Sequence, residues 1–277
     1  MRALLCGLVA AAALAAGCAS KVVPPIEGVV WQIDNEHTQP RGDWERLGVQ
    51  RLLVQWTVVD NLAFVPGTGL PAGSNMPDWQ RIAGQPWARE VILGLAGRFD
   101  ERGARTSLEE LAQLSARIAK SPPPVNVTGW YFPVEIDPTW MEAFRLKALL
   151  APLPRPLWIS VYDSANVGPE ELAQSLVEWL PPDVGVFFQD GVGVHARDAF
   201  VARHYANVLA RRLGRERVRL IAEAFRPDPG GGFRPATLAE LQPQLATYEG
   251  FPIYLFEGPR YVDSSLVQGL AAGQKPR

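Results

Sequence analysis

Residues Pro169–Asp190 read PEELAQSLVEWLPPDVGVFFQD and contain a helical and an extended pattern in succession. In Pro169–Leu180 the apolar residues recur at the spacing of one helix face. Val184–Phe188 is a short apolar run rich in β-branched and aromatic residues, as in a buried strand. A helix that leads into a buried strand is half of a βαβ unit, so this stretch predicts a parallel α/β sheet.

The same strand pattern recurs along the chain. Eight short apolar runs are found, at Gly28–Ile33, Arg51–Thr57, Glu90–Leu95, Asn126–Phe132, Leu157–Val161, Val184–Phe188, Val218–Ala222 and Pro252–Phe256. From Val29 to Ile253 there are 224 residues in seven steps, a mean of 32 per step. A βαβ unit takes about 30 residues, so the spacing predicts one such unit for each step.

Helical patterns lie between most of these runs, at Asp43–Leu47, Ser107–Ala119, Thr139–Leu150, Pro169–Leu180, Arg197–Leu213, Leu238–Leu245 and, short, Ser264–Ala271. Eight repeats favour a single closed (β/α)8 TIM barrel over residues 28–272. An irregular insertion, Leu62–Arg89, follows the second strand. The alternative is an open doubly wound sheet, but its G-x-G-x-x-G phosphate fingerprint is missing after the first strand.

The N-terminal residues predict export. Residues 1–17 combine one positive charge, a short apolar run and small residues, which is the pattern of a signal peptide. Ala-Gly-Cys18 resembles a bacterial lipobox, which implies lipidation of Cys18, and Ala19 resembles the outer-membrane sorting class. We expect a lipidated tether at residues 18–27, a tail at 273–277, and an outer-membrane lipoprotein facing the periplasm or the cell surface.

Composition argues against several function classes. The net charge of −2 and a pI of 6.0 give no long-range attraction to nucleic acid. Cys6 and Cys18 are the two cysteines, so the mature domain has no thiol for catalysis. The three histidines form neither H-x-H nor H-E-x-x-H, and no G-x-S-x-G elbow is present. We therefore expect no metal and no cofactor, and contact with the membrane only through the lipid anchor.

The ends of the predicted strands are rich in acids and aromatics, and in a barrel of this type those ends line the active site. Acids bind sugar hydroxyls, and aromatic rings stack on the apolar face of a pyranose. Glycoside hydrolysis needs two carboxylates that flank one bond. Glu135 and Glu223, at the ends of strands four and seven, are the predicted catalytic pair. The predicted substrate-binding residues are Trp31, Trp56, Tyr131, Tyr162, Asp163, Gln189, Asp190 and Glu257.

Most of these residues also have a structural interpretation. Glu135 could be a helix-start or loop acid, and Glu223 a member of a buried ion pair. Asp163 and Asp190 precede turn-forming residues and could bond their own backbone. Aromatic residues in strands belong mostly to the core, so we expect about two of Trp31, Trp56, Trp130, Tyr131 and Tyr162 at the mouth.

Five runs carry a resemblance to a family. They are Gly28-Val-Val-Trp-Gln, Leu53-Val-Gln-Trp-Thr, Gly129-Trp-Tyr-Phe-Pro-Val-Glu135, Phe188-Gln-Asp-Gly-Val-Gly193 and Ala222-Glu-Ala-Phe225. They resemble an uncharacterised bacterial lipoprotein family of glycosidase-like TIM barrels and, more distantly, the clan A glycoside hydrolases. The resemblance implies that Glu135 is the acid/base, that Glu223 is the nucleophile and that configuration is retained. Clan A enzymes carry Asn before the strand-four Glu, where this chain has Val134.

The sequence thus predicts a periplasmic, lipid-anchored glycoside hydrolase that acts on an exopolysaccharide or envelope glycan by two-carboxylate acid/base chemistry. Its expected partner is a polysaccharide or oligosaccharide. The alternative is a non-catalytic lipoprotein that binds glycan or scaffolds a polysaccharide or envelope complex.

Overall fold

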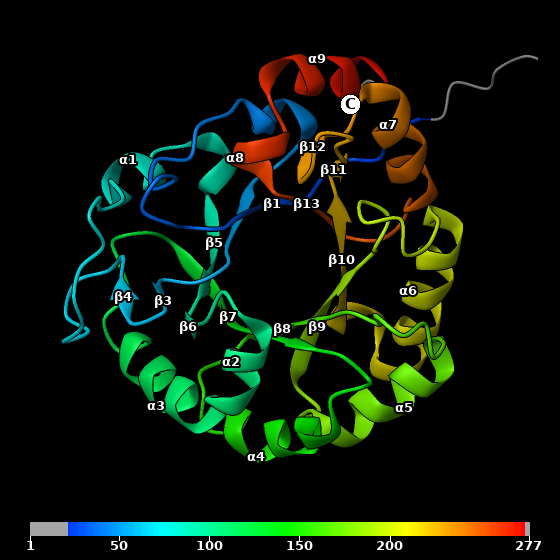
Figure 1. Cartoon of the computed structure of the whole chain (residues 1–277). Helices are drawn as coiled ribbons and strands as arrows, with labels where there is room; N and C mark the ends of the chain where they lie inside the picture. The colour runs from blue at the N-terminus through cyan, green and yellow to red at the C-terminus, as the bar shows by residue number, and fades with distance from the viewer. Residues whose placement is uncertain (1–21, 275–277) are drawn as a thin grey trace, which may run out of the picture.

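A computed structural model describes residues 22–274 of the chain. Its centre is a closed barrel of eight parallel strands (Figure 1). In chain order these strands are β1 (Gly28–Trp31), β2 (Arg51–Val54), β5 (Glu90–Gly94), β7 (Val127–Ile136), β8 (Leu157–Val161), β9 (Val184–Gln189), β10 (Val218–Glu223) and β13 (Ile253–Phe256). Each predicted run overlaps one of them, and β7, β9 and β10 extend beyond the predicted ends. The TIM-barrel prediction is confirmed, and the open-sheet alternative is wrong.

Helices form a ring outside the strands (Figure 1). They are the 3-10 helices η1 (Trp44–Leu47) and η3 (Met141–Arg145) and the α-helices α3 (Leu108–Ile118), α4 (Leu146–Leu150), α5 (Pro169–Trp179), α6 (Ala199–Leu213), α7 (Leu238–Thr247) and α9 (Ser264–Ala272). These elements fall on the seven predicted helical stretches, and η3 and α4 together cover the stretch predicted at Thr139–Leu150.

The strands are apolar on both faces because both faces are covered. Their outward residues pack with the helices in one large core, as Leu52 and Val186 do. Their inward residues form a separate apolar cluster that fills the barrel, made of Val30, Leu53, Ile92, Tyr131, Trp158, Phe187, Ile221 and Tyr254. A filled interior of this kind leaves space for a ligand only at the ends of the barrel.

Several elements near the C-terminal ends of the strands had no counterpart in the sequence patterns. A small sheet, β4 (Leu62–Ala63), β3 (Val58–Val59) and β6 (Ala96–Gly97), flanks the barrel, and α2 (Glu101–Thr106) follows β6. The insertion after β2 is irregular, as predicted, and continues with α1 (Trp79–Ala83) and η2 (Pro86–Ala88). The remaining short helices are η4 (Arg215–Arg217) and α8 (Gly258–Tyr261).

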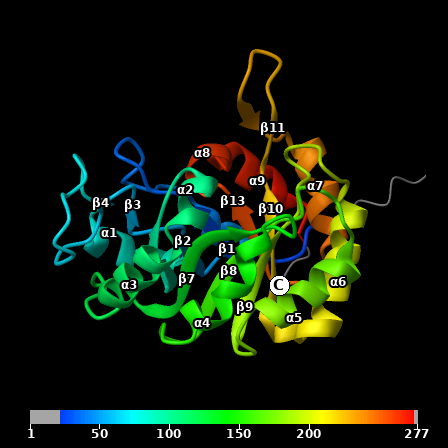
Figure 2. The ribbon, with the colours of Figure 1, turned by 60° about the horizontal axis from the view of Figure 1, so that its bottom comes forward.

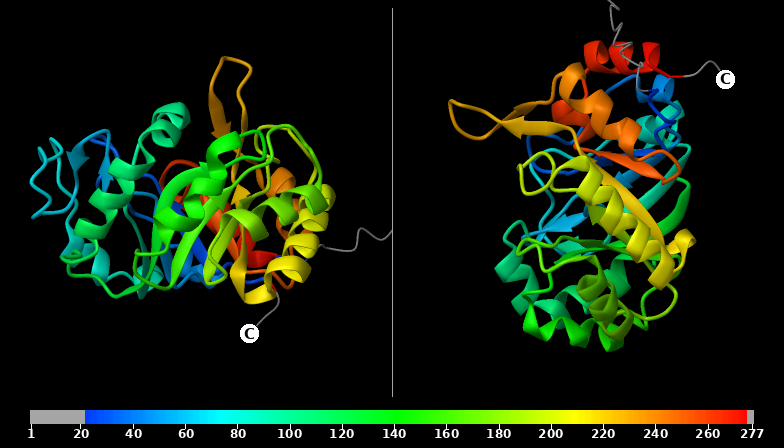
Figure 3. Two further views of the ribbon diagram at one scale, coloured as in Figure 1. Left: turned by 90° about the horizontal axis from the view of Figure 1, so that it is seen from below. Right: turned by 90° about the vertical axis from the view of Figure 1, so that its right-hand side faces the viewer.

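A two-stranded hairpin, β11 (Phe225–Pro227) and β12 (Phe233–Pro235), projects from the barrel after β10 (Figures 2 and 3). Gly231 and Gly232 at its tip have φ values of +100° and +75°, in the left-handed region that favours glycine. The hairpin therefore begins two residues after Glu223 and stands on the side of the barrel where the strands end.

The two ends of the described part of the chain meet at the opposite end of the barrel, where Val23 pairs with Gln274. The signal segment and Cys18 lie outside the described residues, as do residues 275–277. Within the segment predicted as a tether, Val23 and Ile26 are buried, and the Val23 amide donates to the Gly273 carbonyl. These contacts extend the folded domain to Val23. Across residues 22–274, no helix combines the length and apolar character that crossing a membrane requires.

Candidate active site

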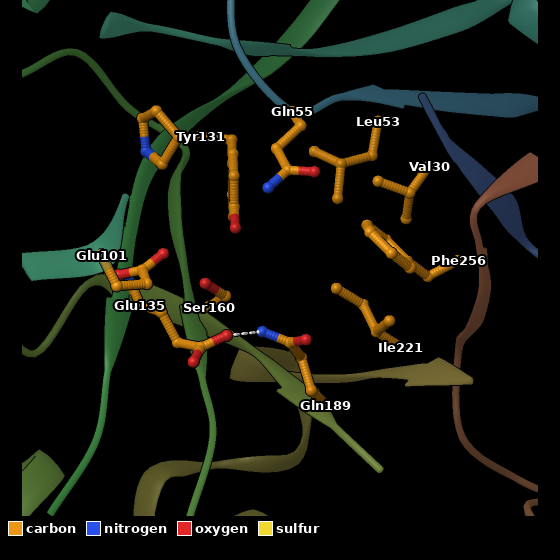
Figure 4. Close-up of a pocket in the computed structure, with 11 residues that line it drawn as sticks. Val30, Leu53, Gln55, Glu101, Tyr131, Glu135, Ser160, Gln189, Ile221 and Phe256 are labelled. Atoms are coloured by element: carbon orange, nitrogen blue, oxygen red, sulfur yellow. Dashed lines mark hydrogen bonds between the residues drawn. The ribbon is translucent and has the colours of Figure 1, made fainter. Parts of the chain in front are cut away.

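A cavity of about 160 Å³ lies above the apolar interior of the barrel, where the strands end (Figure 4). Its apolar wall is made of Val30, Leu53, Pro133, Ile221 and Phe256, and its polar wall of Gln55, Glu101, Tyr131, Glu135, Ser160 and Gln189. Sites that enclose a drug-sized ligand have roughly 300–1,000 Å³. This cavity is smaller, so any ligand larger than one small ring would extend beyond it.

Glu135 reaches the cavity because β7 is irregular near its end. Phe132 pairs with Ile159 of β8, but the next pair is Glu135 with Ser160, so β7 holds two extra residues there. One of them is Pro133, which has no N–H to give to the sheet. The irregularity brings the Glu135 side chain level with Ser160, and both line the cavity.

The surroundings of Glu135 favour its protonated form. Burial raises the pKa of Glu135 to about 8, and the charge of Glu101 acts in the same direction. The Gln189 side-chain amide donates a hydrogen bond to the Glu135 carboxylate, which lowers the pKa and partly offsets these effects (Figure 4). A carboxyl group that keeps its proton near neutral pH can serve as a general acid.

Glu101 is a functional candidate that the sequence analysis missed. It begins α2 and lines the cavity beside Glu135 (Figure 4). Its Oε2 accepts the Glu135 backbone amide at 3.3 Å. Burial raises the pKa of Glu101 above its usual value, although the side chain is still 43% exposed and keeps contact with solvent. The available signal was an acid in the first turn of the short helix that follows the third barrel strand.

Glu223 ends β10 on the inward side of that strand, two residues after Ile221 of the barrel interior. It is 4% exposed and is not among the residues that line the cavity. Its Oε2 accepts the amides of Gly193 at 2.7 Å and Val194 at 3.2 Å, so the loop between β9 and α6 lies over it.

Burial raises the pKa of Glu223 to about 8, with a further contribution from the charge of Asp190 and a smaller one from Glu135. The two amide hydrogen bonds act in the opposite direction. The predicted pair, Glu135 and Glu223, is therefore within electrostatic reach, but in this structure only Glu135 faces the cavity.

Asp190 lies below the loop that covers Glu223. It is fully buried, and its Oδ1 accepts the amides of Val192 and Glu223, both at 3.2 Å. Its Oδ2 accepts the Gln244 side-chain amide at 2.6 Å and the Tyr248 hydroxyl at 2.7 Å. These four donors join β9, β10 and α7, so the structure gives Asp190 a supporting position rather than one on the cavity wall.

Asp163 is also buried and holds its own loop. Its carboxylate accepts the amides of Val167 at 3.1 Å and Gly168 at 3.2 Å, and the Tyr205 hydroxyl at 2.8 Å. Tyr162, the preceding residue, is half-buried, with the Arg197 guanidinium 5.1 Å from its ring centroid. This arrangement matches the turn interpretation of Asp163 from the sequence.

Two of the predicted tryptophans lie in the core. Trp31 is fully buried, packs on Trp79 and donates to the His37 carbonyl at 2.8 Å. Trp56 is 3% exposed and donates to the Ile33 carbonyl at 2.8 Å. With their indole N–H groups satisfied, both rings belong to the core that the strands share with the surrounding helices. Of the predicted aromatics, Tyr131 lines the cavity.

Glu257 belongs to a separate charged cluster where β1 and β13 end. It is 1% exposed, its Oε1 accepts the Gln32 amide at 2.7 Å, and its Oε2 lies 2.9 Å from Arg260 Nε. Arg260 also pairs with Asp34, which lies 2.9 Å from His37 Nδ1. Burial raises the pKa of Glu257 to about 7. Within residues 22–274, no group of three or more His, Cys, Asp or Glu side chains is placed to hold a metal ion.

Comparison with known proteins finds a structure with the same fold but no matching family. No model of a known protein family matches the sequence. An uncharacterised protein of Escherichia coli K12, YbcH, is 25% identical over 216 residues, which cover 67% of this chain and 71% of that protein.

Two solved structures match this chain in a structural comparison. A candidate alpha-L-fucosidase from Bacteroides thetaiotaomicron superposes with a TM-score of 0.62 at 16% identity, over 95% of this chain and 96% of its own. The glycoside hydrolase domain of PgaB from Bordetella bronchiseptica gives a TM-score of 0.46 at 13% identity, over 91% of this chain and 100% of its own. The fucosidase likeness shows that the barrel is shared over nearly the whole chain.

Proposed function

We propose that this protein is a glycoside hydrolase in which Glu135 donates the proton to the leaving glycosidic oxygen. The observation that carries the proposal is the position of Glu135 on the cavity wall, with its pKa raised to about 8 and its carboxyl held by Gln189. Departure of a sugar alkoxide needs an acid that is protonated at working pH, and this environment provides one. The likeness of this barrel to that of the candidate fucosidase supports the proposal.

The proposal gives the second carboxylate role to Glu223. Around the barrel, β7 and β10 are separated by β8 and β9, so Glu135 and Glu223 approach the cavity from different sides. Glu101 comes from the same side as Glu135, and the two cannot flank one bond (Figure 4). In the described structure burial and the charge of Asp190 raise the pKa of Glu223 to about 8, although the amides of Gly193 and Val194 act in the opposite direction. A role as nucleophile or base therefore requires the loop between β9 and α6 to move aside, so that Glu223 reaches the sugar and loses its proton.

Two other cavity groups fit a carbohydrate. Gln55 Oε1 is buried and has no hydrogen-bond partner among the described residues, so it is available to accept from a sugar hydroxyl. The aromatic rings of Tyr131 and Phe256 provide apolar surface on the same cavity. A polar wall opposite an apolar one matches the two faces of a pyranose.

The proposal includes the location of the enzyme. Residues 1–17 direct export, Cys18 carries the lipid, and the barrel acts at the outer membrane on an exopolysaccharide or envelope glycan. The support for this part is the sequence of residues 1–19.

The test is incubation of the full chain with a panel of bacterial polysaccharides, followed by detection of new reducing ends. We expect cleavage of at least one glycan by the wild type. Loss of a general acid costs about 10²–10⁴-fold, so Glu135→Gln should abolish measurable turnover, and Glu223→Gln should do the same. Full activity in either variant would remove that residue from the mechanism.

A second candidate is a glycan-binding barrel without turnover. The observation that favours it is the burial of Glu223 beneath the loop between β9 and α6, away from the cavity. Binding of a glycan that the wild type never cleaves, with unchanged affinity in Glu223→Gln, would support this candidate.

A further inference from the structure

A second cleft lies beside the catalytic cavity, on the other side of α2. It has a volume of about 440 Å³ and is formed by α2 and the segment around η3. The residues that line it, which we call the arginine cleft, are Arg102, Arg105, Thr106, Trp140, Glu142 and Arg145. The proposed glycosidase chemistry uses none of these side chains.

The arginine cleft has an excess of positive charge. Three guanidinium groups line it against the single carboxylate of Glu142. Arg145 pairs with Glu109, which lies outside the lining, while Arg102 is exposed and its guanidinium contacts no acidic group in the described part of the chain. At least one guanidinium therefore remains free to bind an anion from solution.

Arg105 fixes the cleft relative to the catalytic residue. Its Nη2 donates to the Glu135 backbone carbonyl at 3.1 Å, and its guanidinium carbon lies 5.3 Å from the centroid of the Trp140 ring. Its Nε is 3.9 Å from Glu101 Oε2. Arg105 thus lines the cleft while contacting two residues that line the catalytic cavity.

We propose that the arginine cleft binds an anionic substituent of the substrate, a carboxylate or a phosphate, while the reacting bond lies at Glu135. This inference rests on the proposed function and narrows it to acidic glycans. Guanidinium groups suit the role because their planar array of donors matches the oxygens of a carboxylate or phosphate. Trp140 is 6% exposed and forms an apolar part of the cleft wall, where its ring lies against the Arg105 guanidinium.

The test measures binding by calorimetry, apart from any cleavage, with the full chain carrying Glu135→Gln so that no ligand is consumed. The probes are a short oligogalacturonate, the same oligomer with its carboxyls methyl-esterified, and inorganic phosphate. We expect the oligogalacturonate to bind at least about tenfold more tightly than the ester, and added salt to weaken it. Tight binding of phosphate with weak binding of the oligogalacturonate would instead identify a phosphorylated glycan.

Arg102→Ala and Arg145→Ala supply the site variants, and Arg211→Ala, an exposed arginine on α6, is the matched control. Because Arg102 is exposed, its removal should leave the fold intact. We expect each site variant to lose about tenfold or more in affinity for the charged probe, and the control to bind as before. Equal affinity for the charged and esterified oligomers, or site variants that bind like the control, would overturn the inference.

The two proposals fail separately. If the wild type cleaves no glycan but Arg102→Ala binds the charged probe more weakly, the proposal of an anion site in the arginine cleft is supported and the proposal of a hydrolase is contradicted. If the wild type cleaves only neutral glycans, and Arg102→Ala binds the charged probe like the wild type, the proposal of a hydrolase is supported and the proposal of an anion site is contradicted.

Discussion

Glu135 acquires its chemical character from three neighbours that lie far from it in the sequence. Gln189 donates to its carboxylate, Glu101 accepts from its amide, and Arg105 donates to its carbonyl. Burial then raises its pKa to about 8. A glutamate placed at the end of a strand is predictable from the sequence, but the neighbours that set its acidity depend on the folded barrel.

The raised pKa values predict how stability changes with pH. Glu135 and Glu223 have pKa values of about 8 in the folded protein against a usual 4.5. Between these limits the folded state binds more protons than the unfolded state, so the free energy of unfolding falls as pH rises from about 4.5 to 8. We expect Glu135→Gln to gain stability relative to the wild type over this range, measured by thermal denaturation at pH 5 and pH 8.5.

Other carboxylates have lowered pKa values and change stability with pH in the opposite direction. Glu240 is one, because Arg234 holds its pKa well below the usual range. The difference between variant and wild type cancels these contributions and leaves that of Glu135. The exposed Glu249 supplies a control, Glu249→Gln. A difference between Glu135→Gln and wild type that stays constant with pH, as for the control, would contradict a raised pKa at Glu135.

We expect removal of the buried Asp190 carboxylate to lower the stability of the fold strongly. Asp190→Ala leaves the donors of Val192, Glu223, Gln244 and Tyr248 without their acceptor. Each unsatisfied buried donor costs about 1–3 kcal/mol, and local relaxation makes the total smaller than the sum of the four. We therefore expect Asp190→Ala to lower the free energy of unfolding by about 3–5 kcal/mol, measured by urea denaturation. Asp228→Ala on the exposed hairpin tip should cost less than about 1 kcal/mol. Equal losses in the two variants would show that Asp190 does not hold the three elements together.

At the scale of elements, the eight strands were predictable because each is apolar on both faces and recurs at the length of one βα unit. The elements that were missed lack such a pattern. The hairpin β11–β12 pairs only three residues on each side, and α2 has six residues, so neither is long enough for a periodic signal. The missing elements matter for function, since α2 carries Glu101 and lies between the cavity and the arginine cleft.

The close approach of β2 and β5 predicts a glycine requirement. A Cβ at Gly94 would lie 2.3 Å from backbone atoms of Val54 and Gln55, which cannot rotate away. We expect Gly94→Ala to destabilise the barrel by about 3 kcal/mol, measured by urea denaturation. At Gly84, in a right-handed helical conformation, the nearest atom would be 3.5 Å away, so Gly84→Ala should change stability by under about 1 kcal/mol. Similar stability of both variants would place the strands further apart than described.

At the scale of the whole molecule, the filled barrel separates two ends with different roles. The two ends of the described part of the chain meet at one end, where Val23 pairs with Gln274, and the cavity opens at the other. The fold could be predicted from the sequence, whereas the position of Glu223 behind a loop could not, because loop conformation follows from tertiary contacts.

The predicted lipid anchor has its own test. Cys18→Ser removes the proposed acylation site. We expect the wild type to fractionate with membranes and to incorporate labelled palmitate in a bacterial host, and the variant to do neither. Membrane association that survives Cys18→Ser, without label, would contradict lipidation at this residue.

The central claim is that Glu135 acts as the proton donor in the cleavage of a glycan. The most direct measurement is the rate of new reducing-end formation on the best polysaccharide substrate, for the wild type and for Glu135→Gln at equal protein concentration and pH 6. The account predicts cleavage by the wild type and a loss of at least about 10²-fold in the variant, with its fold intact. Equal rates for the two proteins would contradict it.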